Sequence, residues 1–77
     1  MAETTLDVRE VPPATRHSKI RETFATLERG DTLVLINDHD PKPLFYELQA
    51  EVDAFDADGY SVDQRSEDEF VATFPKK

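Results

Sequence analysis

The chain of 77 residues contains no cysteine, and this absence removes several kinds of chemistry at once. Without a thiol the protein forms no disulfide, offers no thiolate to a metal and has no cysteine nucleophile. It also lacks an apolar run long enough to cross a membrane, and its first five residues are too short and too polar for a signal peptide. We therefore expect one small cytoplasmic domain over residues 1–77, with 1–5 and 75–77 as tails.

The chain is also poor in positive charge. It has nine lysine and arginine residues and 17 aspartate and glutamate residues, which gives a formal net charge of −8. This sign argues against nucleic acid and anionic membranes as partners, because both attract proteins largely through lysine and arginine. The spread of acidic residues along the chain and the scarcity of lysine favour an origin in a halophilic archaeon, whose cytoplasm is rich in salt. The alternative is an acidic domain from a low-salt cell.

The charge balance predicts that stability depends on salt. Carboxylates that repel one another in dilute buffer are screened in roughly 1 M potassium chloride, so the melting temperature should rise markedly over that range. Thermal unfolding followed by circular dichroism measures this directly. A melting temperature that stays flat across the series would contradict the halophilic interpretation.

Hydrophobic periodicity predicts the order strand, helix, strand, helix, strand, strand. Ile20, Phe24 and Leu27 have helical spacing, while the apolar run over 32–37 is typical of a buried strand. Thr15, His17 and Ser18 are alternative caps for the first helix. The expected strands are 6–11, 32–37, 60–65 and 70–74; the expected helices are one ending at Gly30 and one over 41–52.

This order predicts an α+β two-layer sandwich. A helix joins the first two strands, so they are most simply parallel, and the last two form a hairpin in a four-stranded mixed sheet with both helices on one face. Either Leu33 and Leu35 or Val34 and Ile36 must then point away from the helices. The exposed pair, with Val71, forms either a protein-docking surface or an ordinary strand face with scattered apolar side chains.

The least ordinary chemistry lies in the junction between the second strand and the second helix, residues 37–42. We expect Asp40 to cap that helix and Pro41 to be its first residue. Parallel strands end at the same sheet edge, so residues 12–18 should lie beside the junction, where open sheets often bind ligands. The resulting junction edge, a candidate surface for a protein partner or small ligand, comprises Arg16, His17, Asn37, Asp38, His39, Asp40, Lys42 and Tyr46.

Two chemical alternatives concern the histidines and aspartates of this edge. His17 and His39, with Asp38 and Asp40, offer nitrogen and oxygen ligands to a divalent metal, or each serves only as a cap or turn residue. The two aspartates alternatively form a paired-carboxylate acid/base site of an enzyme. Capping explains aspartates at such a position equally well, and the sequence shows no nucleophile beside them.

A third alternative is a small anionic ligand near the helix N-termini, held by Arg16, His17, His39 and Lys42 and opposed by the charges of Asp38 and Asp40. Against it, Lys42 has acidic neighbours with which it should pair. Taken together, these patterns favour a monomeric, non-catalytic binding or accessory domain that needs no cofactor.

Several motifs resemble the TusA/SirA sulfur-carrier fold. Leu6-Asp7, with a proline-rich helix entry six residues later, is similar to that family's Leu-Asp…Cys-Pro-x-Pro opening, and Gly30-Asp31-Thr32-Leu33 is similar to its Gly-Glu-Thr-Leu. Asp38-His39-Asp40-Pro41 resembles its Asp-Asp-Pro with one residue inserted. The resemblance covers nearly the whole chain and implies the same fold. The persulfide-carrying cysteine would fall at Pro13, so sulfur relay is excluded.

The chain also resembles an uncharacterised domain-of-unknown-function family related to that fold and often found beside hemerythrin-like domains. The shared motifs are Leu-Asp-Val-Arg at 6–9, Arg-His at 16–17 and Asn-Asp-His-Asp-Pro-Lys-Pro-Leu at 37–44. This resemblance implies a fold and no established activity, so function has to be argued from the site itself.

Overall fold

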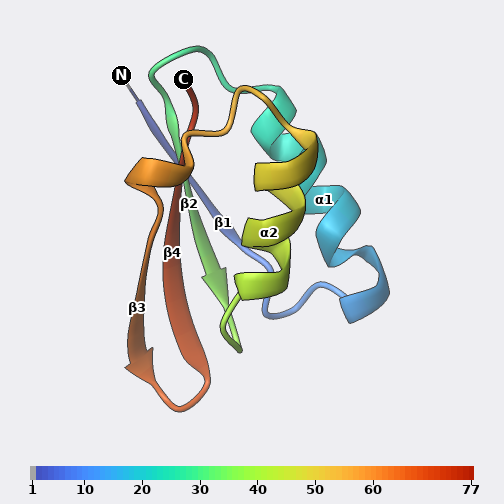
Figure 1. Ribbon diagram of the computed structural model, residues 1–77. Coiled ribbons are helices and arrows are strands. Elements are labelled where there is room, and N and C mark those ends of the chain that lie inside the picture. The colour runs from blue at the N-terminus through green and yellow to red at the C-terminus, as the bar shows by residue number, and fades with distance from the viewer. Residues whose placement is uncertain (1) are drawn as a thin grey trace.

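A computed structural model describes residues 2–77. These residues form a four-stranded sheet and two α-helices, and Figure 1 shows both α-helices on the same face of the sheet. The strand order is β1-β2-β4-β3, with β1 parallel to β2 and the other neighbours antiparallel. This confirms the predicted α+β sandwich. The elements are β1 (Glu3–Asp7), α1 (Pro13–Ala25), β2 (Thr32–Asn37), α2 (Lys42–Glu51), the 3-10 turn η1 (Ala57–Gly59), β3 (Ser61–Ser66) and β4 (Glu69–Pro75).

The first strand begins earlier than the sequence predicted. Strand β1 covers Glu3–Asp7 and not 6–11, because Thr4 and Thr5 pair with Leu33 and Val34 of β2. β-Branched threonines suit an edge strand even where no apolar alternation marks it. The tail expected over residues 1–5 is therefore wrong from Glu3 onward, and Met1 lies outside the described residues.

The tail expected at 75–77 is also wrong, because Lys76 holds the end of α1. Its ammonium Nζ donates to the carbonyl oxygens of Phe24, Ala25 and Leu27 at 3.2, 3.3 and 2.8 Å. The last carbonyls of a helix have no partner within the helix, and a cation there also offsets the negative end of the dipole. The C-terminal segment thus caps a helix some 50 residues earlier in the chain.

Both helix starts differ from the predicted ones. Helix α1 begins at Pro13, ahead of its three candidate caps, and α2 begins at Lys42 with Pro41 as its N-cap. Neither start has a side-chain cap, so the prediction that Asp40 caps α2 is wrong. Proline fits these positions because the first amides of a helix need no intrahelical partner.

The end predicted for α1 was wrong as well. The helix ends at Ala25, and Gly30 takes a left-handed conformation (φ 89°) in the loop before β2, where its amide donates to the carbonyl of Lys76. No helix in residues 2–77 is long and apolar enough to cross a membrane.

The core lies between the helices and one face of the sheet. Leu33 and Leu35 are fully buried there, so Val34 and Ile36 lie on the opposite face. Phe55 brings the segment after α2 into this core, with ring centroids 6.0 Å from Phe24 and 5.6 Å from Phe74. The buried apolar residues are Val8, Ile20, Phe24, Leu27, Leu33, Leu35, Leu44, Leu48, Phe55, Ala72 and Phe74.

Candidate functional site

Arg16 joins the entry of α1 to the junction at the end of β2. Its side chain is only 8% exposed, and its Nη1 and Nη2 donate to the two carboxylate oxygens of Asp38 at 2.9 and 3.2 Å. Nη1 also donates to Oδ1 of the buried Asn37 at 3.1 Å. A bidentate contact of this kind fixes orientation as well as supplying charge attraction.

The remaining contacts of Arg16 tie down the loop between β1 and α1. Nε donates to the carbonyl of Val11 at 2.8 Å, and Nη2 donates to the carbonyl of Arg9 at 3.0 Å. The guanidinium thus makes five hydrogen bonds, equal to its number of N–H donors. All five N–H donors of Arg16 are thus used within the protein, where they join the β1–α1 loop and α1 to the end of β2.

Asp38 is the acceptor at the centre of the junction. The bidentate contact with Arg16 and a 2.8 Å hydrogen bond with Nδ1 of His39 lower the pKa of Asp38 to about 2. Its backbone amide donates to Oδ1 of Asn37 at 2.8 Å. A carboxylate with so low a pKa is a weak proton acceptor near neutral pH, which argues against the acid/base role considered for Asp38.

This interaction predicts a pH dependence. The pKa of Asp38 is lower in the folded protein than its ordinary 3.8, so its contribution to stability is present above about pH 4 and is lost as the pH falls through about 2. Asp38→Asn should be less stable at neutral pH, and the gap to the parent protein should close towards pH 2. Urea unfolding of both proteins across this range measures the gap. A gap that stays constant with pH would contradict the assignment.

His17 and His39 belong to different groups of side chains. His39 hydrogen-bonds to Asp38, whereas Nδ1 of His17 lies 3.7 Å from Oε1 of Glu47 on α2. No three histidine, aspartate or glutamate side chains within residues 2–77 are grouped closely enough to hold a metal ion. The metal site proposed from His17, Asp38, His39 and Asp40 is therefore not formed. His17 is separated from His39 because it follows Arg16 on α1, and its side chain therefore points about 100° away from the direction of the junction.

The polar groups left accessible at the junction edge are His17 on α1, which is 55% exposed, and those of α2 and the loop before it. His39 is 64% exposed and Tyr46 is 56% exposed, with its ring 5.3 Å from that of Phe45. Lys42 is also exposed, and it forms no ion pair with any residue from 2 to 77, so the pairing expected with its acidic neighbours is absent. Asp40 is exposed beside them.

Two residues near this edge were not among the sequence candidates. Glu47 connects the helices, with Oε2 lying 3.5 Å from Nη1 of Arg21 in addition to its contact with His17. The hydroxyl of Tyr60 is buried and has no hydrogen-bond partner in residues 2–77. Burial, and to a smaller extent the charge of Asp40, raises the pKa of Tyr60. Only the tertiary packing of Tyr60 against Phe45, with centroids 4.4 Å apart, reveals this placement.

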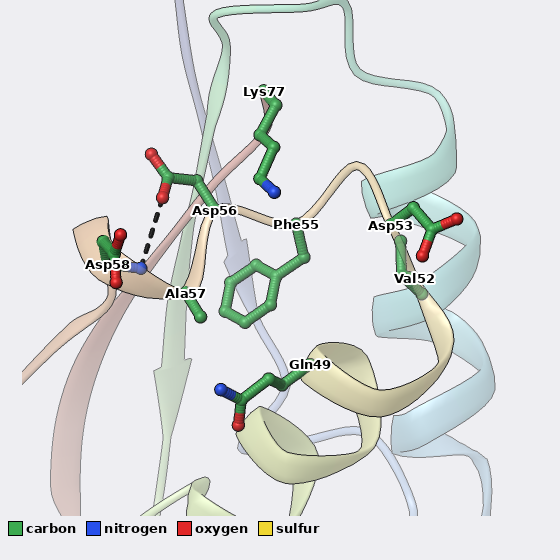
Figure 2. Close-up of a pocket in the computed structure, with 8 residues that line it drawn as sticks. All are labelled: Gln49, Val52, Asp53, Phe55, Asp56, Ala57, Asp58 and Lys77. Carbon is green, nitrogen blue, oxygen red and sulfur yellow. Dashed lines mark hydrogen bonds between the residues drawn. The ribbon is translucent and has the colours of Figure 1, made fainter.

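Three cavities lie away from the junction edge. One of about 300 Å³ lies beyond the C-terminal end of α2, and Figure 2 shows Phe55 and three aspartates among the residues that line it. Asp56 accepts from the amide of Asp58 at 3.2 Å and so caps η1, which is a structural role. Two others, of about 250 and 400 Å³, lie between the helices and beside β1. No junction residue lines any of these three cavities.

Comparison with known proteins gives a family and nothing more specific. The model of a family described as "Uncharacterized conserved protein (DUF2249)" matches residues 5–76, which is nearly the whole chain. Neither a curated protein nor a solved structure matches.

Proposed function

The chain belongs to the DUF2249 family of uncharacterized conserved proteins, and we propose that it is a non-catalytic binding or accessory domain that recognises a protein partner at the junction edge. The observation that carries the proposal is that His39, Lys42 and Tyr46 are exposed next to a backbone segment that the Arg16–Asp38 ion pair holds in place. A surface held in one conformation loses little entropy when a partner binds.

The chemistry of these groups supports a protein over a small ligand. Small-molecule sites are concave, whereas none of the three cavities includes a junction residue. Tyr46 is one of two large apolar side chains exposed in residues 2–77, the other being Val62. Tyrosine is enriched among the residues that anchor protein interfaces, and Tyr46 lies about one helical turn after Lys42 on α2.

Two further parts of the proposal concern catalysis and kinship. The Asp38–His39 pair resembles half of a catalytic triad, but no hydroxyl in residues 2–77 hydrogen-bonds to His39, and Asp38 is held by Arg16. The order of elements supports a relationship to the TusA/SirA fold. The resemblance to a family often found beside hemerythrin-like domains supports a hemerythrin-like domain as the partner. We further propose that the chain binds this partner as a cytoplasmic monomer.

Site-specific photocrosslinking tests the proposed edge. Benzoylphenylalanine replaces Tyr46 in one variant and Gln49, an exposed residue near the other end of the same helix, in a matched control. In extracts of the cells that produce the protein, we expect one defined protein adduct from position 46, reduced at least fivefold by Lys42→Glu. Equal adduct formation at both positions, or no adduct at position 46, would contradict the proposal.

A further inference from the structure

Figure 1 shows α1 and α2 on one face of the sheet, so the opposite face, called here the open face, is covered by neither helix. Strand alternation places Val34 and Ile36 of β2 on this open face, together with Val71 of β4. The register sets Ile36 beside Val71, and Val34 between Thr5 and Thr73. The three aliphatic side chains are only partly buried by their neighbours within the sheet.

The rim of the open face has more carboxylate groups than positively charged side chains. Asp7 on β1 and Asp63 on β3 flank the row formed by Ile36 and Val71. Each of these aspartates is paired with an arginine two residues later, at 2.9 Å and 2.8 Å respectively. Glu3 and Glu69 lie on the same face and form no ion pair within residues 2–77, although Glu69 lies within the field of Arg9.

We propose that the open face docks a basic amphipathic helix of a partner protein, with aliphatic side chains on one stripe and lysine or arginine beside it. A helix is the element that would complete a further layer on a sheet already covered on one side. Its aliphatic side chains would cover Val34, Ile36 and Val71, and its cations would meet Glu3 and Glu69. The surface lies on the opposite side of the sheet from α2, so it is separate from the junction edge.

A second copy of the chain fits this face poorly. Two copies packed through it would bring together two acidic rims, and each copy carries a net charge of −8. Like charges that face one another across an interface oppose association unless salt screens them. The excess of carboxylates on the rim therefore selects a cationic partner.

The test is an NMR titration of the full chain, in a buffer of about 50 mM salt so that the rim is not screened. The probe is a designed peptide of about 18 residues, or five helical turns, with leucine on one face and lysine on the other. A peptide with glutamate in place of lysine is the control. We expect the lysine peptide to shift amides of β1, β2 and β4, with no binding of the glutamate peptide.

Two variants localise the effect. Val71→Thr keeps a β-branched side chain while removing a methyl contact, and the double variant Glu3→Gln, Glu69→Gln removes rim charge without touching the core. Each should weaken binding on the order of fivefold, whereas Tyr46→Ser should leave it unchanged. Equal binding of both peptides, no binding, or shifts confined to the helices would overturn the proposal. So would concentration-dependent shifts of the open face without peptide, because they would identify a second copy as its occupant.

Discussion

Replacing Phe24 with alanine should lower the free energy of unfolding by roughly 3–5 kcal/mol, which is the range for large aromatic truncations in a core. Phe24 is 2% exposed and belongs to the buried stripe of α1. Its ring packs edge-on against Phe55, and Nζ of Lys76 lies 5.4 Å from its centroid. The substitution therefore removes contacts with the helix, the segment after α2 and the C-terminal segment together.

Urea unfolding followed by circular dichroism measures this loss. In so small a domain the variant is expected to be partly unfolded in water, because total stability is only about 5–15 kcal/mol. Phe24→Leu serves as a milder variant that keeps a folded baseline, and Tyr46→Ala, at a position 56% exposed, is the matched control with an expected change within about 0.5 kcal/mol. Equal effects at positions 24 and 46 would contradict the core described above.

Replacing Arg16 with alanine should cost roughly 2–4 kcal/mol of unfolding free energy. The buried side chain of Asn37 and the partly buried carbonyls of Val11 and Arg9 lose their donor. A buried acceptor left unsatisfied costs about 1–3 kcal/mol, and a partly buried one costs less because water can replace the donor. Arg16→Lys restores the charge without the planar fork, so it should recover only part of this loss.

Two comparisons separate the role of Arg16 from a general effect of removing arginine. Arg9→Ala removes a guanidinium whose ion pair with Asp7 is exposed, and exposed pairs contribute little. In the double variant Arg16→Ala, Asp38→Ala the two losses should be clearly less than additive, because both changes break the same contact. Additive losses would show that Arg16 and Asp38 do not act together in the folded protein.

The sequence predicted those parts of the fold that local periodicity controls. Strand β2 was predicted at its observed ends because its apolar run is bounded by polar residues on both sides. Strand β1 was displaced because Thr4 and Thr5 carry no apolar signal, and their pairing depends on β2. The cap that Lys76 supplies to α1 could not be predicted, since it joins residues that are distant in sequence.

The candidate site was predicted by position but not by direction. The rule that parallel strands end at one edge correctly brought Arg16 next to Asn37 and Asp38. It could not show which side chains face one another, and so it grouped His17 with them. Helical spacing could not separate the two residues, because Arg16 lies four residues before Ile20 and His17 three, and both positions border the buried stripe of α1.

The most direct test of the account is hydrogen exchange at Nε–H of Arg16, observed by NMR near neutral pH with and without inorganic phosphate. If Arg16 joins the start of α1 to the junction, its Nε–H signal should be resolved and should exchange far more slowly than those of the exposed Arg9 and Arg65. Phosphate should not shift this signal. Asp38→Asn should raise its exchange rate towards the rates of Arg9 and Arg65. Exchange as fast as at Arg9 and Arg65, or a shift that saturates with phosphate, would show instead that Arg16 is available to a ligand.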